Sequence, residues 1–366
     1  MKLECSRKDL YDALSFVVPV SSARTALPIL QTLRVTSEGA SLTLLACDGE
    51  MWAERKLLAT VSDPGAVCVQ AKLMNDIVAT LPEGTVSMEL SGTALFVRQG
   101  ASEWRLMALP AEEFPSIPEV NPTSEISLAM GELRDAVGGV SFAVADDTSR
   151  PVLTGVLFTY DGKILTLVAT DTHRLAVMKM DREGIGSEVT AVVPEKALRA
   201  IRNLPMADPE EVKVRFDETR LGVDAGDSKV VAQLLAGTFP NWERVVPSEH
   251  TRTWILDRAE LMDNVKRAMI MAKDNANRVR FSGRGEQVQI TARSEEKGEA
   301  KEELAAVSKN GDIDIAFNGQ YVMQALAALK CDGIRAEMTE PSRAAVFRPA
   351  DDKDSSFCVI MPMALG

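Results

Sequence analysis

Two stretches of this 366-residue chain repeat one another: LPILQTLRVTSEGASLTLLACDGEMWAERK, which begins at Leu27, and RPVLTGVLFTYDGKILTLVATDTHRLAVMK, which begins at Arg150. They align without a gap at an offset of 123 residues. The matched pairs are Pro28 with Pro151, Leu30 with Leu153, Gly39 with Gly162, Leu42 with Leu165 and Asp48 with Asp171. This period far exceeds that of solenoid repeats, so each copy is expected to be a domain.

A third, weaker copy follows at the same offset. Its residues Phe281, Gly285, Val288, Ile290 and Ala292 lie 123 positions after Phe158, Gly162, Leu165, Leu167 and Ala169. Stretches that contain proline and serine, near 116–124 and 246–254, separate the copies and are candidate linkers. The sequence therefore predicts three domains, at residues 1–121, 125–247 and 252–366.

Each copy shows the same succession of patterns. Apolar residues spaced by three and four predict an opening helix, and alternation around a turn such as Asp161-Gly162 predicts a hairpin. The opening helices carry Leu10, Leu14, Val17 and Val18, then Leu133, Ala136, Val137 and Val140, then Leu261, Val265, Ala268 and Met269. A second helix is expected at 72–81, 195–204 and 320–330, before a second hairpin. Blocks of helices and antiparallel strands predict an α+β fold.

Composition excludes several classes of protein. With 41 basic and 53 acidic residues, the net charge of −12 is the opposite of what a groove-gripping DNA binder carries. A DNA-binding protein of this balance must gather its positive charge on one surface, or hold DNA by topology. No stretch approaches the roughly 18 apolar residues of a membrane helix, and the charged N-terminus does not read as a signal peptide. Five scattered cysteines without CxxC argue against disulfides and zinc. We expect a cytoplasmic protein.

Catalytic signatures are missing from the sequence. His173, in TDTHRLA, could form a triad with Asp171 only if a serine nucleophile were available, and there is no G-x-S-x-G elbow. No phosphate-binding glycine loop appears. The pairs Asp146-Asp147 and Asp351-Asp352 are interpreted as solvated loop charge, and the run EEKGEAKEEL (295–304) as a charged strand edge or loop. The sequence predicts neither an enzyme nor a bound cofactor or metal.

The helix expected at 195–204 has a basic side. Lys196, Arg199 and Arg202 recur every third residue, while the apolar residues of the helix occupy roughly the opposite side. For a single helix, an ordinary solvated face would explain this pattern. The repeat favours a shared role, because equivalent helices in a pseudo-symmetric assembly face the same way.

Six segments together carry a resemblance to a known family. They are RTALPIL (24–30), RPVLTG (150–155), ATDTHRLA (169–176), TFPNWERVVP (238–247), FNGQYV (317–322) and VIMPM (359–363). In this order, over the whole chain, they resemble the β sliding clamps, the β subunits of bacterial DNA polymerase III. The resemblance implies three similar α+β domains per chain, and two chains closed head to tail into a six-domain ring. Such a ring encircles double-stranded DNA without reading its sequence. It tethers DNA polymerase, the clamp loader and repair proteins through their short peptide motifs, as a processivity factor.

The resemblance also implies sites. A peptide groove between the second and third domains would be lined by Arg150, Leu153, Thr170, Thr172, His173, Arg174, Leu175, Pro240, Arg244, Val245, Val359, Met361 and Met363. The residues expected to face DNA are Arg24, Lys196, Arg199, Arg202, Lys266 and Arg267. The apolar part of the homodimer contact would come from Trp104, Leu106, Ile270 and Met271.

This sequence departs from the family pattern at the groove. Thr172 stands where relatives often have glycine, and Asp147 is acidic where they can be neutral. The tail ends Ala364-Leu365-Gly366, without the basic residue that many relatives carry after the second methionine.

Two other functions stay open at this point: a paralogue or regulator that does not load onto DNA, and a hydrolase of nucleic acids.

Overall fold

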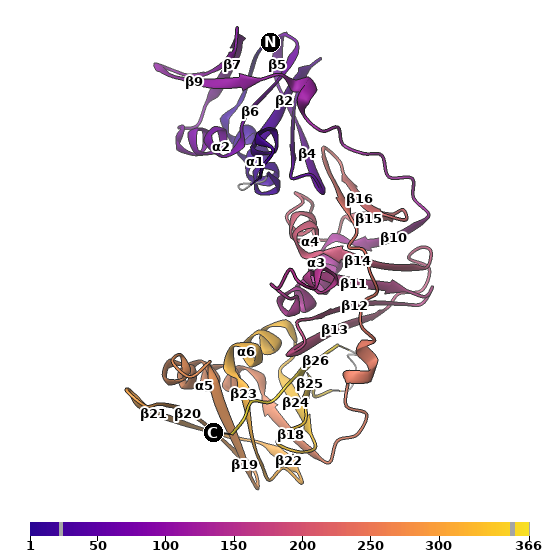
Figure 1. Cartoon of the computed structure of the whole chain (residues 1–366), viewed down its shortest axis with the longest axis vertical. Coiled ribbons are helices and arrows are strands. Elements are labelled where there is room, and N and C mark those ends of the chain that lie inside the picture. The colour runs from indigo at the N-terminus through magenta and orange to yellow at the C-terminus, as the bar shows by residue number, and fades with distance from the viewer. Residues whose placement is uncertain (22–24, 352–355, 366) are drawn as a thin grey trace. The chain divides into compact units, whose positions relative to one another are not determined.

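The computed structural model describes residues 1–21, 25–351 and 356–365. The chain forms two compact units, whose helices and strands are labelled in Figure 1. The first comprises Met1–Leu133, Ile185–Ser187 and Lys196–Leu234, and the second comprises Arg134–Gly184, Glu188–Glu195 and Leu235–Gly366. The second sequence copy contributes to both units, so each unit holds one junction between successive copies.

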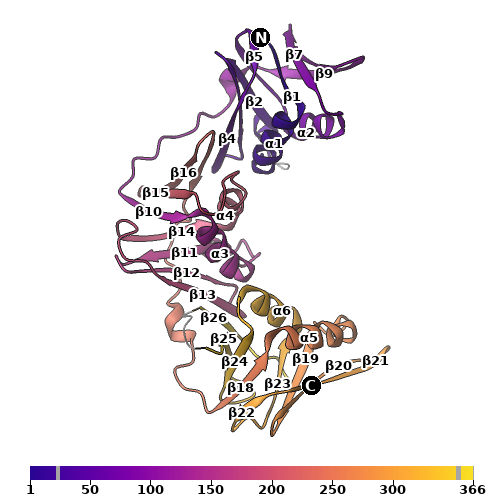
Figure 2. The ribbon, with the colours of Figure 1, turned by 180° about the vertical axis from the view of Figure 1, so that it is seen from behind.

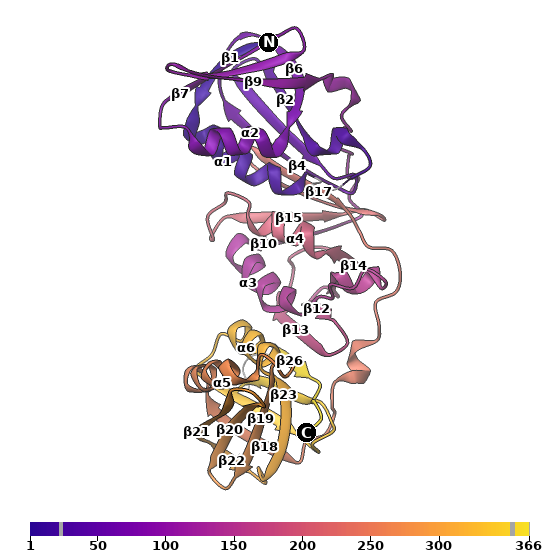
Figure 3. The same ribbon diagram turned by 60° about the vertical axis from the view of Figure 1, so that its left-hand side comes forward.

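The first unit is built on one antiparallel sheet in the order β10-β15-β16-β17-β4-β3-β2-β6-β9-β8-β7-β1-β5. Its strands are β1 (Lys2–Ser6), β2 (Thr32–Glu38), β3 (Ser41–Cys47), β4 (Met51–Leu58), β5 (Thr60–Asp63), β6 (Gly65–Gln70), β7 (Thr85–Ser91), β8 (Ala94–Gln99), β9 (Ser102–Leu109), β10 (Ser124–Ala129), β15 (Glu211–Phe216), β16 (Arg220–Ala225) and β17 (Ser228–Gln233). Helices α1 (Arg7–Val17) and α2 (Ala71–Thr80) pack side by side (Figure 3). The helices α3 (Met130–Val140) and α4 (Glu195–Arg202) each contribute residues to both units.

The second unit contains two sheets. The larger has the order β14-β11-β12-β13-β26-β25-β24-β18-β22, and the smaller β21-β20-β19-β23 (Figure 2). The strands are β11 (Gly155–Tyr160), β12 (Ile164–Thr170), β13 (Arg174–Asp181), β14 (Val189–Pro194), β18 (Arg252–Asp257), β19 (Arg278–Arg284), β20 (Gln287–Ser294), β21 (Gly298–Ala305), β22 (Val307–Lys309), β23 (Ile313–Asn318), β24 (Gly333–Met338), β25 (Ala345–Pro349) and β26 (Phe357–Ile360). Helices α5 (Arg258–Ala272) and α6 (Gly319–Ala328) pack against each other.

The predicted α+β fold and its helices are confirmed. Most of the apolar positions that the spacing picked out are buried, including Leu10, Leu133 and Leu261. Two positions differ, because Val18 starts a short 3₁₀ turn after α1 and Met269 is only half-buried. The helix ends follow capping chemistry: the Asp257 carboxylate, for example, accepts a hydrogen bond from the Glu260 N–H at the start of α5 (2.8 Å).

The predicted turns and the charged edge are also found. Gly162 and Gly285 have φ angles of +92° and +57° in their hairpin turns, a region that favours glycine. Most of the charged run 295–304 forms β21, which is an edge strand of its sheet. The second linker was predicted too long: residues from Arg252 onward already pair with β24, because Trp254 and Leu256 alternate into the core.

The cysteines and the helices agree with what the sequence composition predicts. Four cysteines are buried and Cys331 is half-buried, and all five are free thiols. Burial raises the pKa of the Cys358 thiol to about 12, so this sulfur stays protonated near neutral pH. No helix among the described residues is both long and apolar enough to span a membrane.

Candidate functional site

A cavity of about 270 Å³ opens in the second unit where three distant segments meet. These segments are the β12–β13 turn, the short helix η6 (Trp242–Val245) with the residues before it, and the end of β26. The lining residues are Thr170, Thr172, Arg174, Leu175, Pro240, Asn241, Trp242, Val245, Val359 and Met361. This cavity is called the groove below.

Strand pairing between the second and third copies builds the floor of the groove. Strand β26 of copy three lies antiparallel to β13 of copy two, with Val359 opposite Leu175. The pairing extends past the strand, because the Met361 N–H donates to the His173 carbonyl (2.9 Å). The side chains of Leu175 and Val359 are each only 3% exposed, and both belong to a buried cluster that includes Phe239. The floor is therefore apolar, and the backbone hydrogen bonds between β13 and β26 hold it in place.

The rim of the groove exposes apolar side chains to water. Val245 is 59% exposed and Met361 is 46% exposed. Trp242 is half-buried against the cluster below, and the Lys179 ammonium lies 5.4 Å from the centre of its ring. A concave apolar surface with a flexible methionine side chain at its edge is suited to a ligand that brings apolar side chains of its own.

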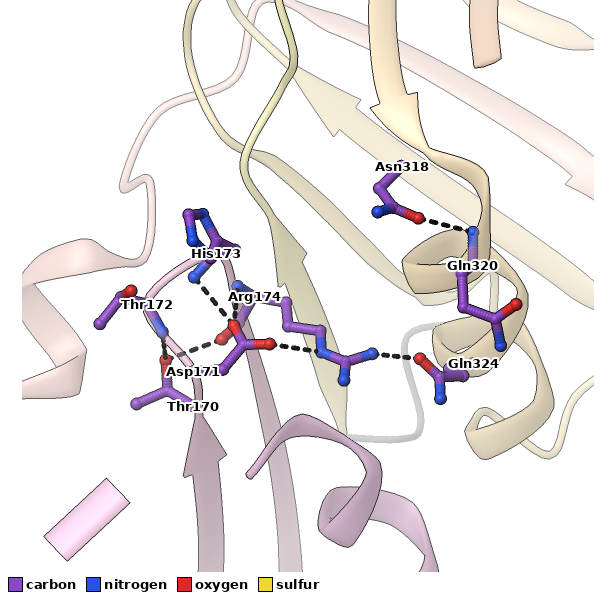
Figure 4. A network of polar contacts seen from close by, with 8 residues as sticks. All are labelled: Thr170, Asp171, Thr172, His173, Arg174, Asn318, Gln320 and Gln324. Carbon is purple, nitrogen blue, oxygen red and sulfur yellow. Dashed lines mark hydrogen bonds and ion pairs between the residues drawn. The ribbon is translucent and has the colours of Figure 1, made fainter. Parts of the chain in front are cut away.

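The β12–β13 turn is held by its own polar groups (Figure 4). The Asp171 carboxylate accepts from the backbone N–H groups of His173 and Arg174, both at 2.9 Å. The Thr170 hydroxyl donates to the Arg174 carbonyl (2.7 Å) and accepts from the Thr172 N–H (3.1 Å). These bonds keep Thr172 at a φ of +77°, where a residue with a Cβ is strained.

Arg174 connects this turn to α6 of the third copy. Its Nε lies 3.0 Å from Asp171, and its Nη1 donates to the Gln324 side chain of α6 (Figure 4). The guanidinium stacks over Phe142 and Tyr321, with 5.3 Å and 4.3 Å to the ring centres. The side chain is only 11% exposed. Arg174 therefore positions the groove wall rather than offering a free cation to a ligand.

The structure brings together eight of the thirteen residues predicted for the groove. The other five, which do not line this cavity, are Arg150, Leu153, His173, Arg244 and Met363. Leu153 lies in the buried cluster, and His173 and Arg244 are exposed near the rim. Arg150 is exposed and faces Asp147 at 3.7 Å, while Met363 pairs with Ala316. Asn241 and Trp242 were missed, although both lie within the TFPNWERVVP segment that carried the resemblance.

The residues predicted to face DNA lie in three different settings. Arg199 and Arg202 are exposed on α4, whose opposite side buries Leu198 and Ile201 as predicted. Lys196 forms an ion pair with Asp48. On α5, Lys266 is exposed, whereas Arg267 pairs with Glu302 (2.8 Å) and so lowers the pKa of that carboxyl group. Arg24 lies outside the described residues, as does Asp352 of the second carboxylate pair.

The predicted dimer residues divide between surface and core. Ile270 is 63% exposed, and Trp104 and Met271 are half-buried. Leu106 is only 2% exposed, which corrects its assignment to a surface contact. Side chains alternate along a strand, so the neighbour Met107 points out of β9 instead and is 64% exposed.

The strand edges of the described residues that could pair with another chain include those of β21 and β9. Strand β21 is the last strand of its sheet and pairs with β20. Strand β9 pairs with β8 along its length, but only its last residues, Ala108 and Leu109, also pair with β6. Among the described residues, the earlier part of β9 has no strand on its second side. Unpaired strand edges are ready templates for intermolecular pairing.

Comparisons with known proteins agree on the family. Models of the DNA polymerase III beta subunit match residues 1–118 (N-terminal domain), 127–241 (central domain) and 243–364 (C-terminal domain). The beta sliding clamps of Vibrio cholerae and Escherichia coli are 32% and 30% identical, each over 100% of both chains. A solved sliding clamp of Pseudomonas aeruginosa bound to griselimycin is 28% identical, with a TM-score of 0.91 and 100% coverage of both chains. One of Bacillus subtilis is 25% identical, with a TM-score of 0.92 and the same coverage.

The three family matches follow the order of the three sequence copies, and the full-length relatives leave no part of the chain unmatched. The chain therefore belongs to the DNA polymerase III beta subunit family, and it is a DNA sliding clamp, a processivity factor of DNA replication.

Proposed function

We propose that two copies of this chain close head to tail into a ring around duplex DNA, and that the groove holds the peptide motifs of the proteins that use the ring. In this proposal the domains run over 1–121, 125–247 and 252–366. The protein acts on cytoplasmic DNA and performs no catalysis of its own. Its work is to keep polymerase, clamp loader and repair proteins on the template.

The single observation that carries the peptide proposal is the groove itself. A preformed apolar floor, made by Leu175 and Val359, lies beneath an exposed apolar rim. A peptide that places a leucine or phenylalanine there gains about 1.5–3 kcal/mol per buried side chain. After ordering costs, two or three such contacts give micromolar affinity, near about −8 kcal/mol. Partners held at this strength can exchange while the clamp stays on DNA.

Weak contact with DNA suits the same role. The chain carries a net charge of −12, but the exposed side of α4 presents Arg199 and Arg202. In our proposal these side chains meet phosphates rather than bases, so they carry no sequence information. Encirclement, not affinity, then keeps the protein on DNA.

The dimer contact is proposed between β9 of one chain and β21 of its partner. Both strands have an unpaired edge. The apolar part of the contact would come from the predicted residues Ile270, Met271 and Trp104, and from the exposed Met107, which replaces Leu106. Pairing along these edges would satisfy backbone groups that are otherwise left to water.

The groove can be tested by direct binding. Fluorescence anisotropy would measure the affinity of a short polymerase-tail peptide for the wild type and for the double variant Val245→Ala/Met361→Ala. Both residues are exposed, so the fold should survive. The matched control is Ile255→Ala/Val307→Ala, which removes exposed apolar residues of the same unit away from the groove. We expect the groove variant to bind about tenfold or more weakly and the control to bind like the wild type. Equal affinity in all three proteins would place the peptide site elsewhere.

A further inference from the structure

A second cavity, of about 600 Å³, lies on the smaller sheet of the second unit. Along β19 the side chains alternate, with Val279 and Phe281 buried while the residues between them face the cavity. Strand β20 adds residues of the same polar kind. The principal cationic and amide residues of this lining are Arg278, Arg280, Arg284, Arg293, Gln287 and Gln289. We name this surface the arginine hollow.

The arginine hollow faces away from α5. That helix packs against β19, β20 and β21 (Figure 3). Arg267 of α5 reaches Glu302 of β21, and the buried side of α5 includes Leu261 and Val265. Successive strand residues point to opposite faces, so the arginines of β19 stand on the other side of the sheet. In a chain of net charge −12, four arginines gathered on one open sheet face require an explanation.

Asp314 holds part of the hollow in place. Its carboxylate lies 3.3 Å from Arg280 and 2.8 Å from Arg284. Although burial raises the pKa of Asp314, hydrogen bonds from Ser282 and Arg284 outweigh it and hold that pKa below its usual value. The carboxylate thus stays ionised and presents both guanidinium groups in a fixed position. Among the described residues, Arg293 makes no ion pair, so its charge is available to a ligand.

The C-terminal segment links the hollow to the groove. Met361 lines the groove, and the Met363 N–H donates to the Ala316 carbonyl of β23 (2.7 Å). One step further, the Ala364 carbonyl accepts from Arg278 Nη1 (3.4 Å), and Leu365 lines the hollow. The two cavities therefore lie at the two ends of one short stretch of chain.

We propose that the arginine hollow binds the carboxylates of an acidic segment that continues from a peptide seated in the groove. This inference rests on the proposed peptide-binding function and adds the chemistry of the partner. Planar guanidinium groups match carboxylates in a two-pronged geometry. The Gln287 amide can bond the peptide backbone, whereas the Gln289 amide donates to the Glu303 carboxylate (3.1 Å). The seven residues of β19 from Arg278 to Arg284 span six steps, or roughly 20 Å, of strand. An extended acidic segment of similar length would therefore cover the hollow.

Nucleic acid is the less suitable occupant of this surface. Lys266, the exposed α5 residue predicted to face DNA, belongs to the helix on the other side of the sheet. Glu299 and Glu303 also lie among the arginines. A run of phosphates would meet these carboxylates, whereas a peptide can place neutral residues opposite them.

The test compares five peptides built on one polymerase tail: the unextended peptide, and peptides extended by six glutamates or by six glutamines at either the N-terminal or the C-terminal end. Affinities are measured by fluorescence anisotropy for the wild type and for Arg284→Gln/Arg293→Gln. The control variant, Lys309→Gln/Lys330→Gln, loses the same charge from exposed residues of the same unit that do not line the hollow. Binding of single-stranded and duplex oligonucleotides is measured in parallel.

We expect the glutamate extension, at one end, to strengthen binding to the wild type by about tenfold at low salt, the sum of two or three exposed ion pairs. The gain should disappear at 1 M salt and in the arginine variant, but persist in the control. The unextended peptide should bind all three proteins equally. An extension without effect, an equal gain in the arginine variant, or a selective loss of oligonucleotide binding in that variant would overturn the inference. Failure of the unextended peptide to bind the wild type would instead overturn the groove proposal, and this inference with it.

Discussion

The guanidinium of Arg174 lies over the ring of Tyr321, 4.3 Å from its centre. The first residue belongs to β13 of the second copy, and the second to α6 of the third. With Asp171 and Gln324, this contact joins the turn that shapes one wall of the groove to the neighbouring domain. The groove therefore depends on how two copies are joined, and not only on the residues that line it.

Loss of Arg174 should harm both stability and binding. Arg174→Ala removes a mostly buried ion pair and two ring contacts, so we expect the free energy of unfolding to fall by roughly 2–3 kcal/mol. Arg174→Lys keeps the charge but not the planar stack, and should recover part of the stability while still weakening peptide binding. Urea unfolding and peptide anisotropy measure the two effects. An Arg174→Ala protein as stable and as active in binding as the wild type would refute this role.

Thr172 offers a test of backbone strain at the groove. Its φ of +77° costs a residue with a Cβ on the order of 1 kcal/mol or more. Thr172→Ala removes the side chain but keeps the strain, while Thr172→Gly removes both. We expect the glycine variant to be the more stable of the two, with peptide affinity shifted in the same direction in both, because both widen the groove. A lower melting temperature for Thr172→Gly than for Thr172→Ala would show that the turn is not strained.

Charge reversal on α4 should weaken association with DNA without unfolding the protein. Arg199→Glu/Arg202→Glu removes two proposed phosphate contacts, so the slope of log affinity against log salt should become shallower by up to about 2. The control Lys56→Glu/Lys213→Glu makes the same change of charge on exposed residues of strands β4 and β15. If the two variants lose DNA association to the same extent, the effect is one of net charge and α4 does not meet DNA.

Substitutions at two adjacent residues of β9 should have different effects on the dimer and on stability. Met107→Ala should raise the dimer dissociation constant with little change in melting temperature, because Met107 is 64% exposed. Leu106→Ala should mainly lower stability, by about 2–5 kcal/mol, because it opens a cavity in the core. Ile270→Ala/Met271→Ala should weaken the dimer further, and Leu58→Ala, at an exposed site on β4, should not. Analytical ultracentrifugation over a concentration series would decide, and an intact dimer at low concentration in the Ile270/Met271 variant would argue against this surface.

The repeats and the helices could be predicted from the sequence, because both show as regular spacings of residue types along the chain. The α+β class, the three copies and positions such as Leu133 and Leu261 follow from periodicity alone. The pairing between strands that are distant in the sequence does not follow from periodicity. The exposure of Met107 in place of Leu106, and the inward direction of Arg174, depend on strand register and on partners such as Tyr321 that lie far away in the chain. The Lys196–Asp48 ion pair could not be predicted from the sequence for the same reason, because it joins residues of two different copies.

Ring closure is the central claim, and an image of the wild-type protein tests it most directly. Electron-microscopy class averages, recorded at a concentration where the dimer forms, should show closed rings with a central hole wide enough for duplex DNA. Compact particles without a hole, or open single chains at every concentration where the protein is folded, would contradict the account.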